Sequence, residues 1–313
     1  MGKIDAVVDN VQPLTDRISA FRLRAAAGGP LPDWEAGAHI DVEIAEGTRS
    51  YSLISFTPVS ASPDSYTIAV QREDDGTGGS AAMHELQAGD ALTISQPKND
   101  FQVTPDTDAL LLAGGIGVTP LISMAAAVKD AGQNIRFHYA GRSADIMAYR
   151  TALAETLGEA FTLHCDDDAS ALNLDALIAT LGDAHLYVCG PRGMIDAARA
   201  KAEAAGVPAD RIHFELFEAA APQEGDTAFE VQINDGSVFT IPPGRSIIDV
   251  LEENDVDVMY DCQRGDCGIC QCDVLEGEPD HRDVVLSEAE RAAGDVMQIC
   301  VSRAKSARLV LDI

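Results

Sequence analysis

The stretch CQRGDCGICQC, residues 262–272, packs four of the chain's seven cysteines into eleven positions. Four residues separate Cys262 from Cys267, two separate Cys267 from Cys270, and twenty-nine intervene before Cys300. Clustered thiols in a chain without a visible export signal indicate metal binding or catalysis rather than disulfides. The loop therefore predicts a thiolate site that takes its last ligand from a distant point in the chain.

The spacing C-x4-C-x2-C with a remote fourth cysteine is typical of plant-type [2Fe–2S] ferredoxins. It predicts a cluster held by four thiolates, from Cys262, Cys267, Cys270 and Cys300. Zinc is the alternative, but zinc sites usually pair two short cysteine knuckles, and the sequence has one here. Cys272 is interpreted as a bystander, because two further residues of extended chain carry it roughly 7 Å past Cys270.

The sequence around this loop divides into three segments of different texture. Residues 1–104 hold alternating, β-branched runs broken by Gly, Pro and Asp, which favours an antiparallel barrel or sandwich with one short helix at 79–86. Residues 105–221 alternate strand and helix patterns, which is typical of a parallel sheet covered by helices. After linker-like residues, 227–313 predict a small α+β domain that contains the cysteine loop.

A glycine-rich turn marks the second segment. In ALLLAGGIGVTPL, Gly114, Gly115 and Gly117 lie between a buried strand and a helix, a geometry that directs backbone N–H groups at a phosphate. Thr119 is expected to cap this helix, and Gly132 to end it. An ordinary tight turn would have the same pattern. A later strand, HLYVCGPRGM, ends in Cys189 and Gly190 at the edge where such sheets bind ligands, although a buried small residue would also explain the cysteine.

Two motifs in the first segment predict an anion site. In RSYSL, Arg49, Tyr51 and Leu53 share one face of a strand, which suits a phosphorylated aromatic ligand. GTGGS, residues 76–80, opens the short helix with free backbone amides. A surface arginine beside a half-buried tyrosine, and a plain hairpin tip, are the alternatives.

The formal net charge of −29 makes nucleic acid and an anionic membrane surface poor partners. Residues 227–313 hold 18 acidic and 7 basic residues, which gives −11 and suggests an acidic docking face for a basic protein partner. An ordinary acidic enzyme is an equal reading. With no signal peptide and no apolar run of membrane-spanning length, a cytoplasmic protein without membrane association is expected.

RSYSL, GTGGS, LLAGGIGVTPL, YVCGP, FELF, the four spaced cysteines, HRDVVLSEAE and ICVSRAKSARLVLDI occur in this order. In this set the chain resembles the phthalate dioxygenase reductase family, including vanillate demethylase and carnitine monooxygenase reductases, over nearly its whole length. The resemblance implies a multidomain fold: an FMN-binding antiparallel β-barrel (1–104), an NAD(H)-binding α/β parallel-sheet domain (105–221) and an α+β, β-grasp ferredoxin domain (227–313). It also implies a monomer that passes electrons from NADH through FMN and the [2Fe–2S] cluster to a Rieske-type oxygenase.

The resemblance also implies roles for single residues. Tyr51 would lie against the isoalloxazine, with Ser52 near its N5, Cys189 near the nicotinamide, and Phe217 stacked by the flavin. The remaining FMN-binding residues, chiefly around the phosphate, would be Arg49, Ser50, Gly78, Gly79 and Ser80. The remaining residues of the dinucleotide pocket would be Gly114, Gly115, Gly117, Thr119, Arg142 and Gly190. Arg142 stands where an arginine could receive a 2′-phosphate, and Thr77 where a basic residue is common.

Two other functions stay open at this point. The same modules also serve cytochrome P450 enzymes, so a P450 reductase is one alternative. An iron–sulfur or zinc redox sensor without turnover is the other. No histidine is assigned a catalytic role, and the acidic run 166–168 is interpreted as a solvated loop.

Overall fold

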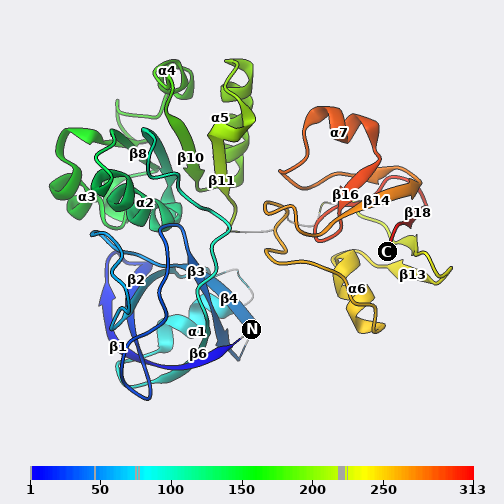
Figure 1. The fold of residues 1–313 in the computed structure, drawn as a ribbon, viewed down its shortest axis with the longest axis horizontal. Helices are drawn as coiled ribbons and strands as arrows, with labels where there is room; N and C mark the ends of the chain where they lie inside the picture. The colour runs from blue at the N-terminus through cyan, green and yellow to red at the C-terminus, as the bar shows by residue number, and fades with distance from the viewer. Residues whose placement is uncertain (1, 46, 75, 77, 218–222, 224) are drawn as a thin grey trace. The chain divides into compact units, whose positions relative to one another are not determined.

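The computed structural model describes residues 2–45, 47–74, 76, 78–217, 223 and 225–313. It forms two compact units, Met1–Glu215 and Leu216–Ile313. Figure 1 shows two sheets in the first unit and a smaller α+β fold in the second. The first predicted segment, 1–104, and most of the second, 105–221, fall within the first unit, which ends at Glu215. The exact limits of the predicted domains remain predictions. None of the described helices is long and apolar enough to cross a membrane.

The N-terminal sheet of the first unit is an antiparallel, nearly closed barrel with the strand order β4-β3-β6-β1-β2-β5. Its ends approach each other, because β4 also contacts β5. Inward side chains such as Phe21, Ile40 and Ile68 are fully buried, and Met83 from the single helix fills the interior. The predicted helix is therefore confirmed. The elements are β1 Lys3–Pro13, β2 Ile18–Ala25, β3 His39–Ile44, β4 Gly47–Ser52, β5 Tyr66–Gln71, α1 Gly79–Glu85 and β6 Ala91–Ser95.

The second sheet of this unit is parallel, in the order β11-β10-β7-β8-β9. Its central strand β7 is buried at every position, as expected for a strand covered on both faces. Figure 1 shows α2 and α3 on one side of this sheet and α4 and α5 on the other. The bounds are β7 Ala109–Gly114, α2 Val118–Asp130, β8 Ile135–Gly141, α3 Arg150–Leu157, β9 Phe161–Cys165, α4 Leu174–Ala179, β10 His185–Cys189, α5 Arg192–Ala204 and β11 Ile212–Glu215, with short 3₁₀ turns at Gly115–Gly117, Ala144–Ile146, Gly158–Ala160 and Ala209–Arg211.

The start of α2 differs from the prediction. A 3₁₀ turn over Gly115–Gly117 leads directly into the helix, so Gly117 occupies the cap position and no side chain caps it. Thr119 already lies inside the helix, where its hydroxyl donates to the carbonyl of Ile116 at 3.0 Å. The predicted Thr119 cap is therefore wrong. The helix ends as expected, with Ala131 at its C-cap and Gly132 next, in the left-handed conformation.

The second unit has a mixed sheet in the order β13-β12-β18-β14-β16 and a two-stranded sheet of β15 and β17. The predicted hairpin turns at Gly236, whose φ is +87°. Side chains of Ser246 and Asp249 form a capping box at the start of α6. The bounds are β12 Phe229–Gln232, β13 Val238–Ile241, α6 Ile247–Glu253, β14 Gln271–Glu276, β15 Pro279–Asp280, α7 Glu288–Ala293, β16 Val296–Gln298, β17 Arg303–Ala304 and β18 Arg308–Leu311.

A charged clamp closes the second unit at its N-terminal end. Asp226 accepts two hydrogen bonds from Arg282, at 2.9 and 2.6 Å, and both side chains are only 8% exposed. Arg303 lies 3.9 Å from the same carboxylate and donates to three backbone carbonyls, including that of Thr227 at 3.1 Å. These bonds to Arg282 hold the pKa of Asp226 at about 2. The clamp fixes the residues that precede β12 onto the rest of the unit.

Candidate functional site

The four cysteines predicted to hold a cluster meet in the second unit. Cys270 and Cys300 are buried, and Cys262 and Cys267 are half-buried. The thiol of Cys262 interacts with those of Cys267 and Cys300, and Cys270 interacts with Cys300. Residues distant in the sequence thus present four sulfur atoms to one small space.

The backbone of the loop is shaped for this space. Gln263, Gly265 and Gly268 all have positive φ, between +52° and +83°. A Cβ on Gly265 would lie 2.6 Å from Val301 Cγ2, so only glycine fits against that neighbour. The N–H of Arg264 donates to Cys262 Sγ at 3.3 Å. A tight loop with four converging thiols and an N–H aimed at sulfur fits a [2Fe–2S] cluster.

Asp266 belongs to this site, although sequence reasoning missed it. It lies directly before Cys267, and its carboxylate accepts a hydrogen bond from the N–H of Leu216 at 2.7 Å. Burial raises the pKa of Asp266 to about 7. One acid in an acidic chain gives no sequence signal, because the contact joins residues fifty positions apart.

Cys272 lies apart from these four thiols. It is on β14 opposite Met297, where it packs against the hydrophobic core of the unit. Burial raises the pKa of its thiol to about 12. This environment suits a packed residue, and the bystander role stays a prediction.

In the barrel, the structure brings Arg49 together with the loop that opens α1. A Cβ on Gly79 would lie 2.5 Å from Arg49 Nε, so the guanidinium passes directly over this glycine. Gly78 has a φ of +90°, and Ser80 Oγ accepts a hydrogen bond from the N–H of Glu73 at 2.9 Å. Thr77 lies outside the described residues. A cation beside helix-start amides fits a phosphate group.

The other residues of RSYSL differ in orientation. Tyr51 is half-buried against the barrel core, and burial raises its pKa to about 12. Ser52 is buried at the end of β4. Ser50 points to the opposite face from Arg49 and Tyr51, since side chains alternate along a strand, and its hydroxyl donates to Asp41 at 2.6 Å. The geometry thus places the predicted flavin ligand Ser50 away from the other two.

A cleft of about 910 Å³ opens at the C-terminal edge of the parallel sheet. This edge, beside the central strand β7 where the strand order reverses, is where such sheets bind ligands. Gly114, Gly115 and Arg142 line the cleft, together with residues of the barrel such as Ile18 and Gln71. Thr119 and Cys189 are buried instead, and neither they nor Gly117 and Gly190 are among the lining residues.

Three of the glycines are explained by close packing. A Cβ on Gly117 would lie 2.3 Å from the carbonyl oxygen of Cys189, and one on Gly190 would lie 2.8 Å from the Cα of Gly114. Gly114 has the same restriction against Pro191 and Met194. Gly115 differs, because its φ is +54° and nothing lies near it. These contacts draw two strand ends and the start of α2 together around the cleft, which fits a dinucleotide phosphate.

Charged residues surround the cleft on several sides. Arg142 is exposed after β8, and Asp145, three residues later, and Asp166, whose N–H bonds to the carbonyl of Gly141, also line the cleft. The hydroxyl of Ser143 donates to Asp145 at 2.5 Å, which lowers the pKa of that carboxyl. Asp166 was expected only to be solvated, but the end of β9 carries it into the lining. Its place directly after a parallel strand was the available signal.

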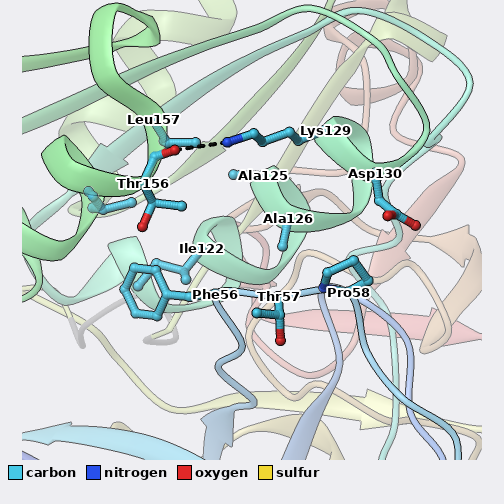
Figure 2. A pocket seen from close by; sticks show the side chains of 11 residues that line it. Phe56, Thr57, Pro58, Ile122, Ala125, Ala126, Lys129, Asp130, Thr156 and Leu157 are labelled. Atoms are coloured by element: carbon cyan, nitrogen blue, oxygen red, sulfur yellow. Dashed lines mark hydrogen bonds between the residues drawn. The ribbon is translucent and has the colours of Figure 1, made fainter.

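Phe217 lies in the second unit, where it is half-buried. It directly precedes residues 218–222, which lie outside the described part of the chain. Its predicted stacking with the flavin therefore stays a prediction. A second, smaller pocket of about 370 Å³ lies between α2, α3 and residues 56–58 of the first unit (Figure 2). None of the predicted site residues lines it.

Comparison with protein families gives two matches within the chain. Residues 111–200 match the oxidoreductase NAD-binding domain, and residues 231–305 match the 2Fe-2S iron-sulfur cluster binding domain. The chain is 40% identical to tetrachlorobenzoquinone reductase of Sphingobium chlorophenolicum, over 99% of this chain and 98% of that protein. It is 38% identical to the carnitine monooxygenase reductase subunit of Escherichia coli K12, over 98% of this chain and 97% of that protein.

Solved structures agree with these relatives. The structure of phthalate dioxygenase reductase matches 100% of this chain and 98% of its own length, with a TM-score of 0.76 and 34% identity. An intact type IV self-sufficient cytochrome P450 monooxygenase matches 99% of this chain with 41% of its own, with a TM-score of 0.76 and 34% identity. The chain therefore belongs to the phthalate dioxygenase reductase family, and it is an NADH-dependent oxidoreductase that uses FMN and a [2Fe–2S] cluster.

Proposed function

We propose that this protein is the reductase component of a Rieske-type oxygenase system and delivers electrons from NADH to that oxygenase. The observation that carries the proposal is the four-thiol loop on a separate compact unit. A one-electron carrier on a unit of its own is needed when the electron acceptor is a second protein that must dock beside it. Relatives of similar length named as reductase subunits of monooxygenase systems support it.

When bound, FMN would supply the conversion of a two-electron hydride donor into single-electron transfers, and the [2Fe–2S] cluster would carry those electrons one at a time. Around that chemistry, Arg49 and the amides of Gly78 and Gly79 would neutralise and orient the FMN phosphate. Tyr51 would cover the ring with its half-buried face. Ser52, at the buried end of β4, would offer a hydroxyl close to N5.

The cleft would bind the dinucleotide through backbone groups. The turn at Gly115 would present N–H groups to the pyrophosphate, because no side chain intervenes there. Gly114 and Gly190 would let the nicotinamide approach between two strand ends, and Cys189, being buried, would support this edge from behind. Arg142 shares the lining of the cleft with two acids, Asp145 and Asp166. Their charges would repel a 2′-phosphate, which agrees with the use of NADH.

In the second unit, Cys262, Cys267, Cys270 and Cys300 would ligate the two irons. The surface beside this loop is suited to a protein acceptor. Met259 is 79% exposed three residues before Cys262, and Asp257 is exposed on the same side of the extended chain. An exposed methionine with an exposed acid two residues before it would dock on a basic oxygenase surface with an apolar centre.

The test combines spectra with partner reconstitution. The purified protein should show flavin and cluster absorbance, both bleached by NADH without air. With an oxygenase encoded beside its gene, NADH oxidation should then drive product formation. A colourless, zinc-loaded protein would refute the reductase and favour a sensor.

A cytochrome P450 is the second candidate acceptor. The P450 monooxygenase structure whose region resembles this whole chain favours it. Reconstitution separates the two, because only one class of acceptor should turn over at low concentrations of reductase. Turnover by a P450 alone would replace the proposed partner while leaving the reductase function intact.

A further inference from the structure

Ser123 joins the two halves of the first unit through one hydroxyl. It lies on α2, and its residue is 1% exposed. Its Oγ donates to the carbonyl of Leu53 at 2.8 Å and accepts from the N–H of Ser55 at 2.9 Å. Both partners are backbone groups of one barrel segment, residues 53–55. The hydroxyl thus links α2 to that segment through two hydrogen bonds.

The segment 53–55 directly follows β4, which carries Arg49, Tyr51 and Ser52. Two of its backbone N–H groups are bonded within the barrel. That of Leu53 donates to Ala38 at 2.8 Å, and that of Ile54 donates to Thr67 at 2.9 Å. The barrel therefore holds the segment from one side and Ser123 holds it from the other.

The N-terminal end of α2, five residues before Ser123, follows the glycine turn of the nucleotide cleft directly. Because a helix is stiff over two turns, the bonds of Ser123 fix the distance between this turn and β4. Packing next to the two hydrogen bonds of Ser123 is incomplete. Figure 2 shows Phe56, Thr57 and Pro58 facing Ile122 and Ala126 across the smaller pocket of about 370 Å³. Packing alone therefore leaves space beside this part of α2, and the two directional hydrogen bonds of Ser123 add to that packing in setting the position of the helix.

We infer that Ser123 is a positioning residue for hydride transfer, which sets the nicotinamide half of the site against the flavin half. The inference rests on the proposed function. Reacting atoms must approach to about 3–3.5 Å, and displacement by about 1 Å can cost roughly 100-fold in rate. Loss of the Ser123 hydroxyl releases Leu53 and Ser55 from α2 while every group predicted to touch FMN or NADH remains.

The experiment uses the full, flavin-loaded protein and the variant Ser123→Ala. Single-turnover bleaching of the flavin by saturating NADH, without air, should slow about 10- to 100-fold. The isotope effect with NADH deuterated at C4 should rise, because hydride transfer becomes more strongly limiting. The half-saturating NADH concentration and the bound flavin should change by less than about threefold, because no residue placed in the binding machinery is altered.

Hydrogen exchange gives a readout that does not depend on activity. The amide of Ser55 should lose protection in Ser123→Ala, while those of Leu53 and Ile54, which bond within the barrel, should keep it. Tyr187→Phe is the matched control. It removes another buried hydroxyl of the same unit, one that accepts from the N–H of Thr104 at 2.9 Å. This control should bleach at the wild-type rate.

Bleaching of Ser123→Ala at the wild-type rate, or an equal slowing in Tyr187→Phe, would overturn the inference. If the alanine variant does not fold, Ser123→Cys, which keeps the side-chain size and weakens both hydrogen bonds, undergoes the same tests with the same expectations. If wild-type flavin is not bleached by NADH, the proposed function fails. Unchanged protection of the Ser55 amide in the variant would show, independently of activity, that the Ser123 hydroxyl does not hold residues 53–55 to α2.

Discussion

The cysteine loop of the second unit and the glycine turn of the first unit build their sites in opposite ways. At the loop, reactive side chains converge, and the backbone bends to present them. At the turn, side chains are missing, and Gly114, Gly117 and Gly190 allow backbone segments to approach within distances that any Cβ would prevent. One site should therefore fail when a side chain is removed, and the other when a side chain is added.

The largest expected effect is at the loop. Cys300→Ser removes the remote thiol, so the cluster should be lost or altered, and reduction of cytochrome c should fall at least about 100-fold. Reduction of ferricyanide, a small acceptor that the flavin can reach directly, should persist. Cys272→Ser is the matched control and should keep the cluster spectrum. Loss of the cluster in both variants would contradict the assigned set of four thiols.

Addition of a methyl group tests the turn. In Gly117→Ala the new Cβ would lie 2.3 Å from the backbone oxygen of Cys189, so the start of α2 must move. The half-saturating NADH concentration for flavin bleaching should rise by about tenfold or more, as roughly 1.4 kcal/mol of binding free energy corresponds to tenfold. Gly115→Ala adds strain of about 1–2 kcal/mol but no clash with the protein itself, so it should lower the free energy of unfolding of the first unit less than Gly117→Ala does. The reverse order would refute the close-packing explanation.

Substitution of Asp226 in the charged clamp tests whether the cysteine loop keeps its cluster only while the second unit is stably folded. Asp226→Asn removes one of the two carboxylates that Arg282 contacts and leaves only Asp280, so it should lower the free energy of unfolding of the second unit by about 2 kcal/mol. In the wild type the folded-state pKa is depressed to about 2. The clamp should therefore stabilise fully above about pH 4 and be lost as the pH falls toward 2. Chemical denaturation monitored at the cluster absorbance, at pH 7 and pH 3, measures both effects.

The smallest effect is expected at the exposed surface beside the loop. Met259→Ala should raise the half-saturating concentration of the oxygenase by about three- to tenfold, since a docking contact is removed, and leave reduction of ferricyanide unchanged. Leu275→Ala is the control, because Leu275 is also exposed, at 56%, but lies on β14 outside the cysteine loop. Equal effects of the two substitutions would exclude Met259 as a specific contact.

The sequence predicted the parts of the molecule that depend on local pattern. The buried run of β7, the hairpin at Gly236 and the cysteine spacing all have short-range signals, and the structure agrees with each. The Thr119 cap failed because the preceding 3₁₀ turn moved the helix start, which residue preferences alone do not reveal. Asp266 and Ser123 were missed for another reason. Their partners lie fifty or more positions away, so only the folded chain brings them together.

The central pair of strands in the second unit, β12 and β18, has a consequence for the order of assembly. They pair in parallel, with Glu230 opposite Arg308, so this pairing joins the two sequence ends of the unit and can form only after the cysteine loop has been synthesised. Domains generally fold from the N-terminus during synthesis, and distant pairings form slowly. The first unit can thus be complete while the thiols are still open to iron delivery. Insertion of the [2Fe–2S] cluster would then be the last step in the assembly of the enzyme.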